Sequence, residues 1–76
     1  MIVNYFEGEG FSFTIDELSY PPQNQWNLGD VISVFGGVDE IDRDMEDYYI
    51  ISDFVDIPEG VVAKIIYSHS LAIAAA

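Results

Sequence analysis

Apolar and polar residues alternate with a period of two near the start of the chain. An apolar stretch at 2–7 is followed by the turn sequence Gly8-Glu9-Gly10 and then by the alternating stretch 11–15. Such alternation is typical of half-buried β-strands, so an N-terminal hairpin with a three-residue loop is predicted. One buried face is expected to carry the apolar residues of the second strand, which are Phe11, Phe13 and Ile15.

The next segment, residues 16–29, has little periodicity and is predicted to be mostly a connection. Asp16-Glu17-Leu18 has room for one short turn, but Pro21-Pro22 stops any longer helix. Trp26 and Leu28 are the apolar residues of this connection, and both are expected to anchor it to the core.

The β-branched stretch 31–35 follows the turn Leu28-Gly29-Asp30 and is predicted to be a strand that ends at Gly36-Gly37. Farther along, 48–55 and 61–67 form the clearest hairpin pattern in the chain, joined by a turn that contains Pro58-Glu59-Gly60.

Two short segments flank this pattern with less definite expectations. Ser68-His69-Ser70 is expected to end the second strand, and the apolar residues 71–76 form either a final strand or a frayed end. The acidic segment 38–47 has Val38, Ile41 and Met45 at helical spacing. It is therefore predicted to be a short helix or a loop, since Asp is depleted in strands.

Together these elements predict one mostly-β domain over residues 1–76, either a small barrel or a curled antiparallel sheet of about five strands. An α+β sheet with one helix at 38–47 is the alternative. The stretch 26–34, with its Gly-Asp turn before an alternating strand, resembles the entry strand of SH3-like small barrels.

Net charge is the compositional feature that says most about the partners to be expected. The chain has 76 residues, with 14 acidic residues against Arg43 and Lys64, and a formal net charge of −12. Direct binding to nucleic acid or to an anionic membrane is not expected, because both require basic residues. The charge exceeds the magnitude of about 2–8 that keeps a small domain soluble, and it costs stability through self-repulsion.

The residues that carry enzyme and metal chemistry are sparse. The chain has no cysteine, and this favours a cytoplasmic setting; neither a signal peptide nor a transmembrane helix is expected. His69 is the single histidine, and Ser68 and Ser70 are expected to point away from it as strand neighbours do. No catalytic site and no cofactor are therefore predicted.

The spacing of Asp42-x-Asp44-x-Glu46 resembles the start of an EF-hand calcium loop. Asp47 stands at the sixth position, where that loop requires glycine, and Asp53 stands at the twelfth in place of glutamate. No metal site is predicted.

The acidic segment remains as the candidate binding site. Closely spaced carboxylates resemble the charge pattern of a nucleic-acid backbone, and long-range attraction to a basic protein would speed association. The predicted partner is a basic nucleic-acid-binding protein, although a solvated acidic face without a partner is also consistent with the charge. The predicted partner-binding residues are Asp39, Glu40, Asp42, Asp44, Glu46, Asp47 and Tyr48.

In size and composition the chain resembles phage-encoded acidic inhibitors, including the nucleic-acid mimics among anti-CRISPR and anti-restriction proteins. The acids of 39–47 carry this resemblance, which implies a non-catalytic inhibitor acting in the host cytoplasm. The alternative function is that of an SH3-like accessory subunit that docks into a larger assembly through Trp26, Tyr48 and Tyr49, since aromatic residues favour interface hot spots.

The charge balance yields a first prediction, which concerns stability. Raising the salt concentration should raise the melting temperature, because repulsion among the 14 acids is screened within a Debye length of about 10 Å at 0.1 M salt. Thermal unfolding of a dilute sample at increasing sodium chloride measures this. A melting temperature that stays constant or falls would show that the acids are not crowded.

Overall fold

A computed structural model shows a mostly-β chain and describes residues 2–19, 23, 25–36 and 45–73. Its described part has five strands and one 3-10 turn, η1, so the predicted mostly-β class is confirmed. The elements in chain order are β1 (Tyr5–Gly8), β2 (Phe11–Phe13), η1 (Ile15–Glu17), β3 (Val31–Phe35), β4 (Met45–Ile57) and β5 (Gly60–Ala72).

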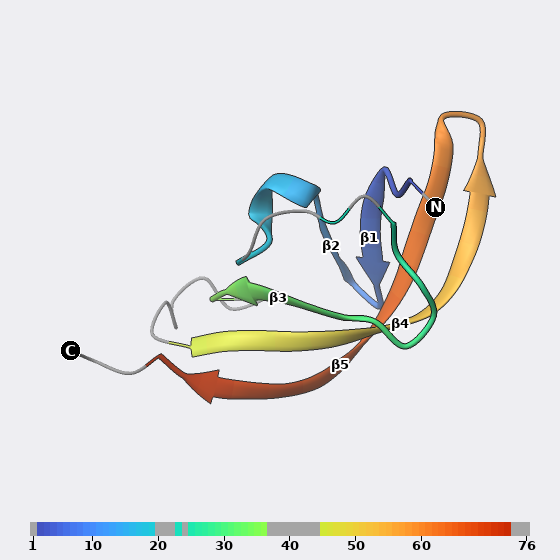
Figure 1. The fold of residues 1–76 in the computed structure, drawn as a ribbon. Helices are drawn as coiled ribbons and strands as arrows, with labels where there is room; N and C mark the ends of the chain where they lie inside the picture. Colours follow the sequence, from blue (N-terminus) through green and yellow to red (C-terminus); the bar gives the residue numbers. More distant parts are fainter. Residues whose placement is uncertain (1, 20–22, 24, 37–44, 74–76) are drawn as a thin grey trace.

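The strands form a single sheet in the order β2-β1-β5-β4-β3 (Figure 1). Three neighbouring pairs are antiparallel, but β1 runs parallel to β5, with Tyr5 opposite Val62 and Glu7 opposite Lys64. The sheet is therefore mixed, and the expectation of antiparallel pairing throughout was wrong at this contact. It is open and curled, so the curled-sheet prediction is confirmed over the barrel, and the described residues contain no α-helix.

The β4–β5 hairpin is the longest part of the sheet and bends strongly along its length (Figure 1). Its register shifts twice, which leaves Ser52 as an extra residue on β4 and Ser68 as an extra residue on β5. Such bulges bend a strand and increase its twist. The prediction that Ser68-His69-Ser70 ends the second strand was therefore wrong. Ser68 is accommodated as a bulge, and β5 continues to Ala72.

The N-terminal hairpin is confirmed but is tighter than predicted. Gly8 pairs with Phe11, so the loop has the two residues Glu9 and Gly10, and Gly10 takes a φ of 84° that favours glycine. The predicted short turn is η1, in which Glu17 accepts a hydrogen bond from the backbone N–H of Thr14 at 2.6 Å. This bond satisfies a donor at the start of the turn.

The core lies on the side of the sheet toward which it curls. Trp26 is 2% exposed and packs edge-to-face on Phe6, with ring centroids 5.1 Å apart, so its predicted anchoring role is confirmed. Leu28 is 63% exposed, and its predicted anchoring role was wrong. The buried cluster comprises Val3, Phe6, Phe13, Trp26, Ile32, Val34, Tyr49, Ile51, Ala63 and Ile65.

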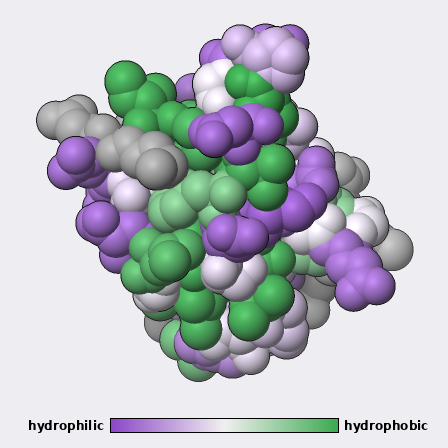
Figure 2. Space-filling model, turned by 90° about the vertical axis from the view of Figure 1, so that its right-hand side faces the viewer, coloured by the Kyte–Doolittle hydropathy of each residue, from purple (hydrophilic) through white to green (hydrophobic). Residues whose placement is uncertain are grey.

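The opposite side of the sheet, called here the outer face, has no covering layer in the described part of the chain. On β4 this face carries Glu46, Tyr48 and Ile50, which alternate with the core residues Tyr49 and Ile51. Figure 2 shows hydrophobic residues reaching the surface between hydrophilic ones on the side of the molecule that lies at the right in Figure 1. The exposed large hydrophobic residues are Ile2, Leu28, Val31, Phe35, Val55, Ile66, Tyr67, Leu71 and Ile73.

The acidic segment is only partly visible. Residues 38–44 of the predicted helix or loop lie outside the described residues, whereas Met45, Glu46 and Asp47 begin β4. A helix that reached residue 47 is thus excluded, because β3 and β5 pair with this stretch on both sides and override the low strand preference of Asp. Among the described residues, no helix has the length and apolar character needed to cross a membrane.

The contrast between Trp26 and Leu28 gives a stability prediction. Trp26→Ala should lower the free energy of unfolding by about 3–5 kcal/mol, because it leaves a cavity in the core beside Phe6. Leu28→Ala, in the same connection, should change it by less than about 0.5 kcal/mol. Urea unfolding followed by circular dichroism measures both; equal losses would contradict the packing described here.

Candidate functional site

The acidic segment joins the sheet at the start of β4, between β3 and β5. Glu46 lies opposite Phe35 on one side and Leu71 on the other, and Tyr48 lies opposite Ser33 and His69. Of the predicted partner-binding residues, the structure thus places Glu46, Asp47 and Tyr48 in the sheet. The others, Asp39, Glu40, Asp42 and Asp44, lie outside the described residues.

Glu46 and Tyr48 are two residues apart on the same strand and share the outer face. Both are half-buried, and the Glu46 carboxylate lies close enough to affect the ionisation of the Tyr48 hydroxyl. Loss of solvation raises the pKa of Tyr48 above its ordinary value of 10.0, and the negative charge and hydrogen bond of Glu46 raise this pKa further. Tyr48 therefore remains a neutral hydrogen-bond donor at neutral pH.

Tyr48 also stacks on His69 of the neighbouring strand, with ring centroids 4.7 Å apart and planes 5° apart. Ser68 Oγ lies 2.8 Å from His69 Nδ1. Ser68 and His69 were expected to point to opposite faces, and this was wrong because Ser68 is the extra residue of the bulge. Sequence alternation carries no signal for a bulge, so this contact could not have been predicted.

The serine–histidine contact is not extended into a catalytic triad within the described residues. A triad needs a carboxylate that orients the second ring nitrogen of the histidine. Asp47, on the neighbouring strand, faces the core side instead, and Glu46 lies opposite Leu71 and not opposite His69.

Asp47 belongs to a separate polar contact on the core side. The residue is 8% exposed, and its carboxylate accepts a hydrogen bond from the hydroxyl of Ser70, which lies directly opposite on β5. Tyr67 Oη lies 2.7 Å from the same Ser70 oxygen. Asp47 thus ties β4 to β5 and offers little carboxylate surface to a partner, in contrast to Glu46.

The aromatic residues proposed for docking are mostly buried. Trp26 is 2% exposed and Tyr49 is 0% exposed, and both belong to the core cluster. Neither can contact a partner without unfolding of the core, so the docking surface expected for an SH3-like subunit was wrong at these two positions. Of the three residues, Tyr48 alone reaches the outer face, where it is half-buried beside His69.

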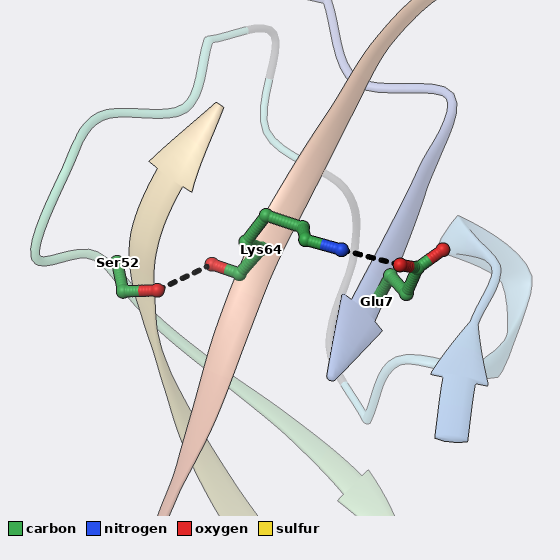
Figure 3. Close-up of polar contacts among 3 residues, drawn as sticks. All are labelled: Glu7, Ser52 and Lys64. Atoms are coloured by element: carbon green, nitrogen blue, oxygen red, sulfur yellow. Dashed lines mark hydrogen bonds and ion pairs between the residues drawn. The ribbon is translucent and has the colours of Figure 1, made fainter. Parts of the chain in front are cut away.

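Basic residues do little to compensate the acidic ones. The described chain holds ten carboxylate side chains and one lysine, and its one ion pair joins Lys64 Nζ to Glu7 across β5 and β1 (Figure 3). Ser52 Oγ donates to the Lys64 backbone carbonyl at 3.3 Å from the other side. Six of these acids are exposed: Glu9, Asp16, Glu17, Asp53, Asp56 and Glu59. Within the described residues, no three acidic or histidine side chains gather as a metal site would require.

The contact between Glu46 and Tyr48 gives a testable pH dependence. Glu46→Gln should lower the pKa of Tyr48 toward 10.0 without reaching it, because the charge is removed but the loss of solvation remains. Glu59→Gln, at the distant hairpin turn, should leave this pKa unchanged. NMR titration of the tyrosine ring carbons measures both variants.

The raised pKa of Tyr48 also determines whether the fold gains or loses stability as the pH rises. Because the folded value lies above the unfolded one, neutral Tyr48 stabilises the fold below about pH 10, and this contribution is lost as the pH rises through the folded pKa. A Tyr48 pKa that is the same in Glu46→Gln and in the unchanged protein would contradict the contact.

Comparison with known proteins gives no family to which this site belongs. Searches against protein-family models, curated proteins and solved structures found no match. Any function for this chain is therefore argued from its own charges, burial and contacts.

Proposed function

We propose that this protein is a non-catalytic inhibitor that presents an acidic surface to the basic nucleic-acid-binding site of a target protein. The observation that carries the proposal is the excess of negative charge. The described residues include ten carboxylates but one lysine, and among these carboxylates only that of Glu7 forms an ion pair. An uncompensated surface of this kind attracts basic proteins over long distances and repels nucleic acid.

The placement of the acids supports a surface role for most of them. The exposed acids come from the β1–β2 turn, η1, the second half of β4 and the β4–β5 turn, which are widely separated in the sequence. Glu46 adds a half-buried carboxylate between the apolar residues Phe35 and Leu71. A charged group beside apolar ones favours a protein partner, which provides both basic and apolar contacts.

Such an inhibitor would act where its target acts, which for a phage-type protein is the host cytoplasm. The resemblance to acidic anti-CRISPR and anti-restriction inhibitors is one of size and composition. The proposed target is therefore a basic nucleic-acid-binding protein, which experiment has to identify.

Affinity capture from a cell lysate, followed by washes of increasing salt, tests the target class. Partners that elute with salt should be nucleic-acid-binding proteins, and the purified chain should displace DNA or RNA from them at a stoichiometric ratio. Partners that resist the salt wash and keep their nucleic acid would contradict mimicry.

Charge reversal tests which acids matter. Asp42→Lys with Asp44→Lys and Glu46→Lys should slow association with the captured target by about ten- to a thousandfold at low salt, because local charge complementarity steers encounter. Stopped-flow or surface-plasmon measurement of the association rate is the readout.

The matched control reverses three acids at or near the hairpin turns, as Glu9→Lys with Asp56→Lys and Glu59→Lys. It changes the net charge by the same six units, and the three side chains are exposed. Equal losses from both triples would mean that only net charge matters. No loss from either would overturn the mimic proposal.

A further inference from the structure

One long strand edge of the sheet has no pairing strand among the described residues. β5 pairs with β1 only from Val62 to Lys64, while its other side pairs with β4 along its length to Ala72. From Ile65 to Ala72 no described residue pairs with the β1 side of β5. Unpaired backbone donors and acceptors on such an edge are a template for another strand.

The other edges of the described sheet are protected. β2 has only three residues, and β3 is covered where Ser33 accepts a backbone hydrogen bond from Ser19 at 2.8 Å. The part of β4 that extends beyond β3 carries the exposed carboxylates of Asp53 and Asp56. Short length, covering segments and edge charges are devices that prevent strand addition. A bulge is another such device, and the bulge at Ser68 is the one that the β5 edge carries among the described residues.

By contrast, residues 65–73 of this strongly acidic chain contain no charged side chain. Four of the nine exposed large hydrophobic residues also fall in this stretch: Ile66 at 56%, Tyr67 at 55%, Leu71 at 52% and Ile73 at 40% exposure. An uncharged edge with exposed apolar side chains fits a partner strand of the same uncharged kind better than a basic one. A second copy of β5 provides such a strand.

We propose that two copies of the chain pair their β5 edges antiparallel about a twofold axis between Ser68 and His69, joining the two sheets. In this register Ile66 lies opposite Leu71 of the second copy, and Tyr67 lies opposite Ser70. The twofold relation makes the contact self-complementary and closed, so it yields a dimer and not a fibre.

The bulge at Ser68 makes this register possible. Residues that lie opposite each other across a twofold axis perpendicular to the sheet must share a face, but Ile66 and Leu71 are five positions apart and would fall on opposite faces of a regular strand. Their partners on β4 are Ile50 and Glu46, which lie on the same outer face. The extra residue thus aligns the two apolar side chains.

Two hollows lie beside this edge, where β1 ends and β5 continues. One, of about 310 Å³, is lined by Phe11, Glu9 and residues 65–67. The other, of about 470 Å³, lies against Glu7, Gly8 and Lys64. The end of the second copy's β5 that carries Leu71 would enter this space, bringing Leu71 next to Ile66 on the outer face.

Sedimentation equilibrium of the purified chain tests the dimer. We expect a concentration-dependent dimer that strengthens between about 0.05 M and 0.5 M salt, because screening reduces repulsion between two copies of charge −12. Ile66→Lys with Leu71→Lys should raise the dimer dissociation constant by about a hundredfold or more.

Leu28→Lys with Val55→Lys is the matched control, because both residues are exposed, lie away from the β5 edge and add the same charge. It should leave the dimer intact, and far-UV circular dichroism checks the fold of both variants. A chain that is monomeric at all concentrations and salts overturns the proposal, and so does equal dissociation in the two variants.

Cysteine cross-linking tests the register, since the chain has no native cysteine. Opposite residues of antiparallel strands have Cβ atoms about 4.5–5.5 Å apart, close to disulfide reach. An oxidised mixture of Ile66→Cys and Leu71→Cys should give a disulfide-linked dimer, whereas either variant alone should give little. Cross-linking of each variant alone as fast as the mixture contradicts this register.

Discussion

The two bulges of the β4–β5 hairpin are the feature on which the rest of the structure depends. The extra residues Ser52 and Ser68 bend a long hairpin that would otherwise be a regularly twisted ribbon. The bend curls the sheet around a core that includes Phe6, Trp26 and Tyr49. For a chain of 76 residues, with little surface to bury, this is how one sheet encloses a core without a second layer.

The same curl divides the chain's chemistry between two faces. Asp47 is turned toward the core side, where Ser70 satisfies its carboxylate, while Glu46 and Tyr48 face outward beside His69. The acidic segment is thus partly structural and partly available to a partner. A strand that alternates its side chains cannot present all of its acids on one surface.

The acidic residues and the unpaired edge of β5 also lie in different parts of the chain. The described acids lie in β1, η1, β4 and the loops and turns, whereas residues 65–73 contain no Asp, Glu, Lys or Arg and include exposed apolar side chains. Long-range attraction to a basic protein and short-range pairing of two copies therefore use different parts of the molecule. Screening by salt should weaken the first and strengthen the second, because the first joins opposite charges and the second joins like ones.

The sequence by itself determined the elements whose signal is local. Alternation in 11–15, the β-branched stretch 31–35 and the turn at Pro58-Glu59 predicted strands and hairpins that the structure contains. Net charge likewise follows from counting, but the apolar pattern predicted an anchoring role for Trp26 and Leu28 alike, and of the two only Trp26 is buried.

Only the tertiary structure decided the features that depend on contacts between distant segments. The parallel pairing of β1 with β5 joins strands more than fifty residues apart, and nothing local distinguishes it from antiparallel pairing. Glu46 and Asp47 lie in a strand because β3 and β5 pair with them on both sides, which overrides the low strand propensity of acidic residues. The bulge at Ser68, which brings Ser68 onto His69, arises from the register of the whole hairpin, and register is a property of two strands together.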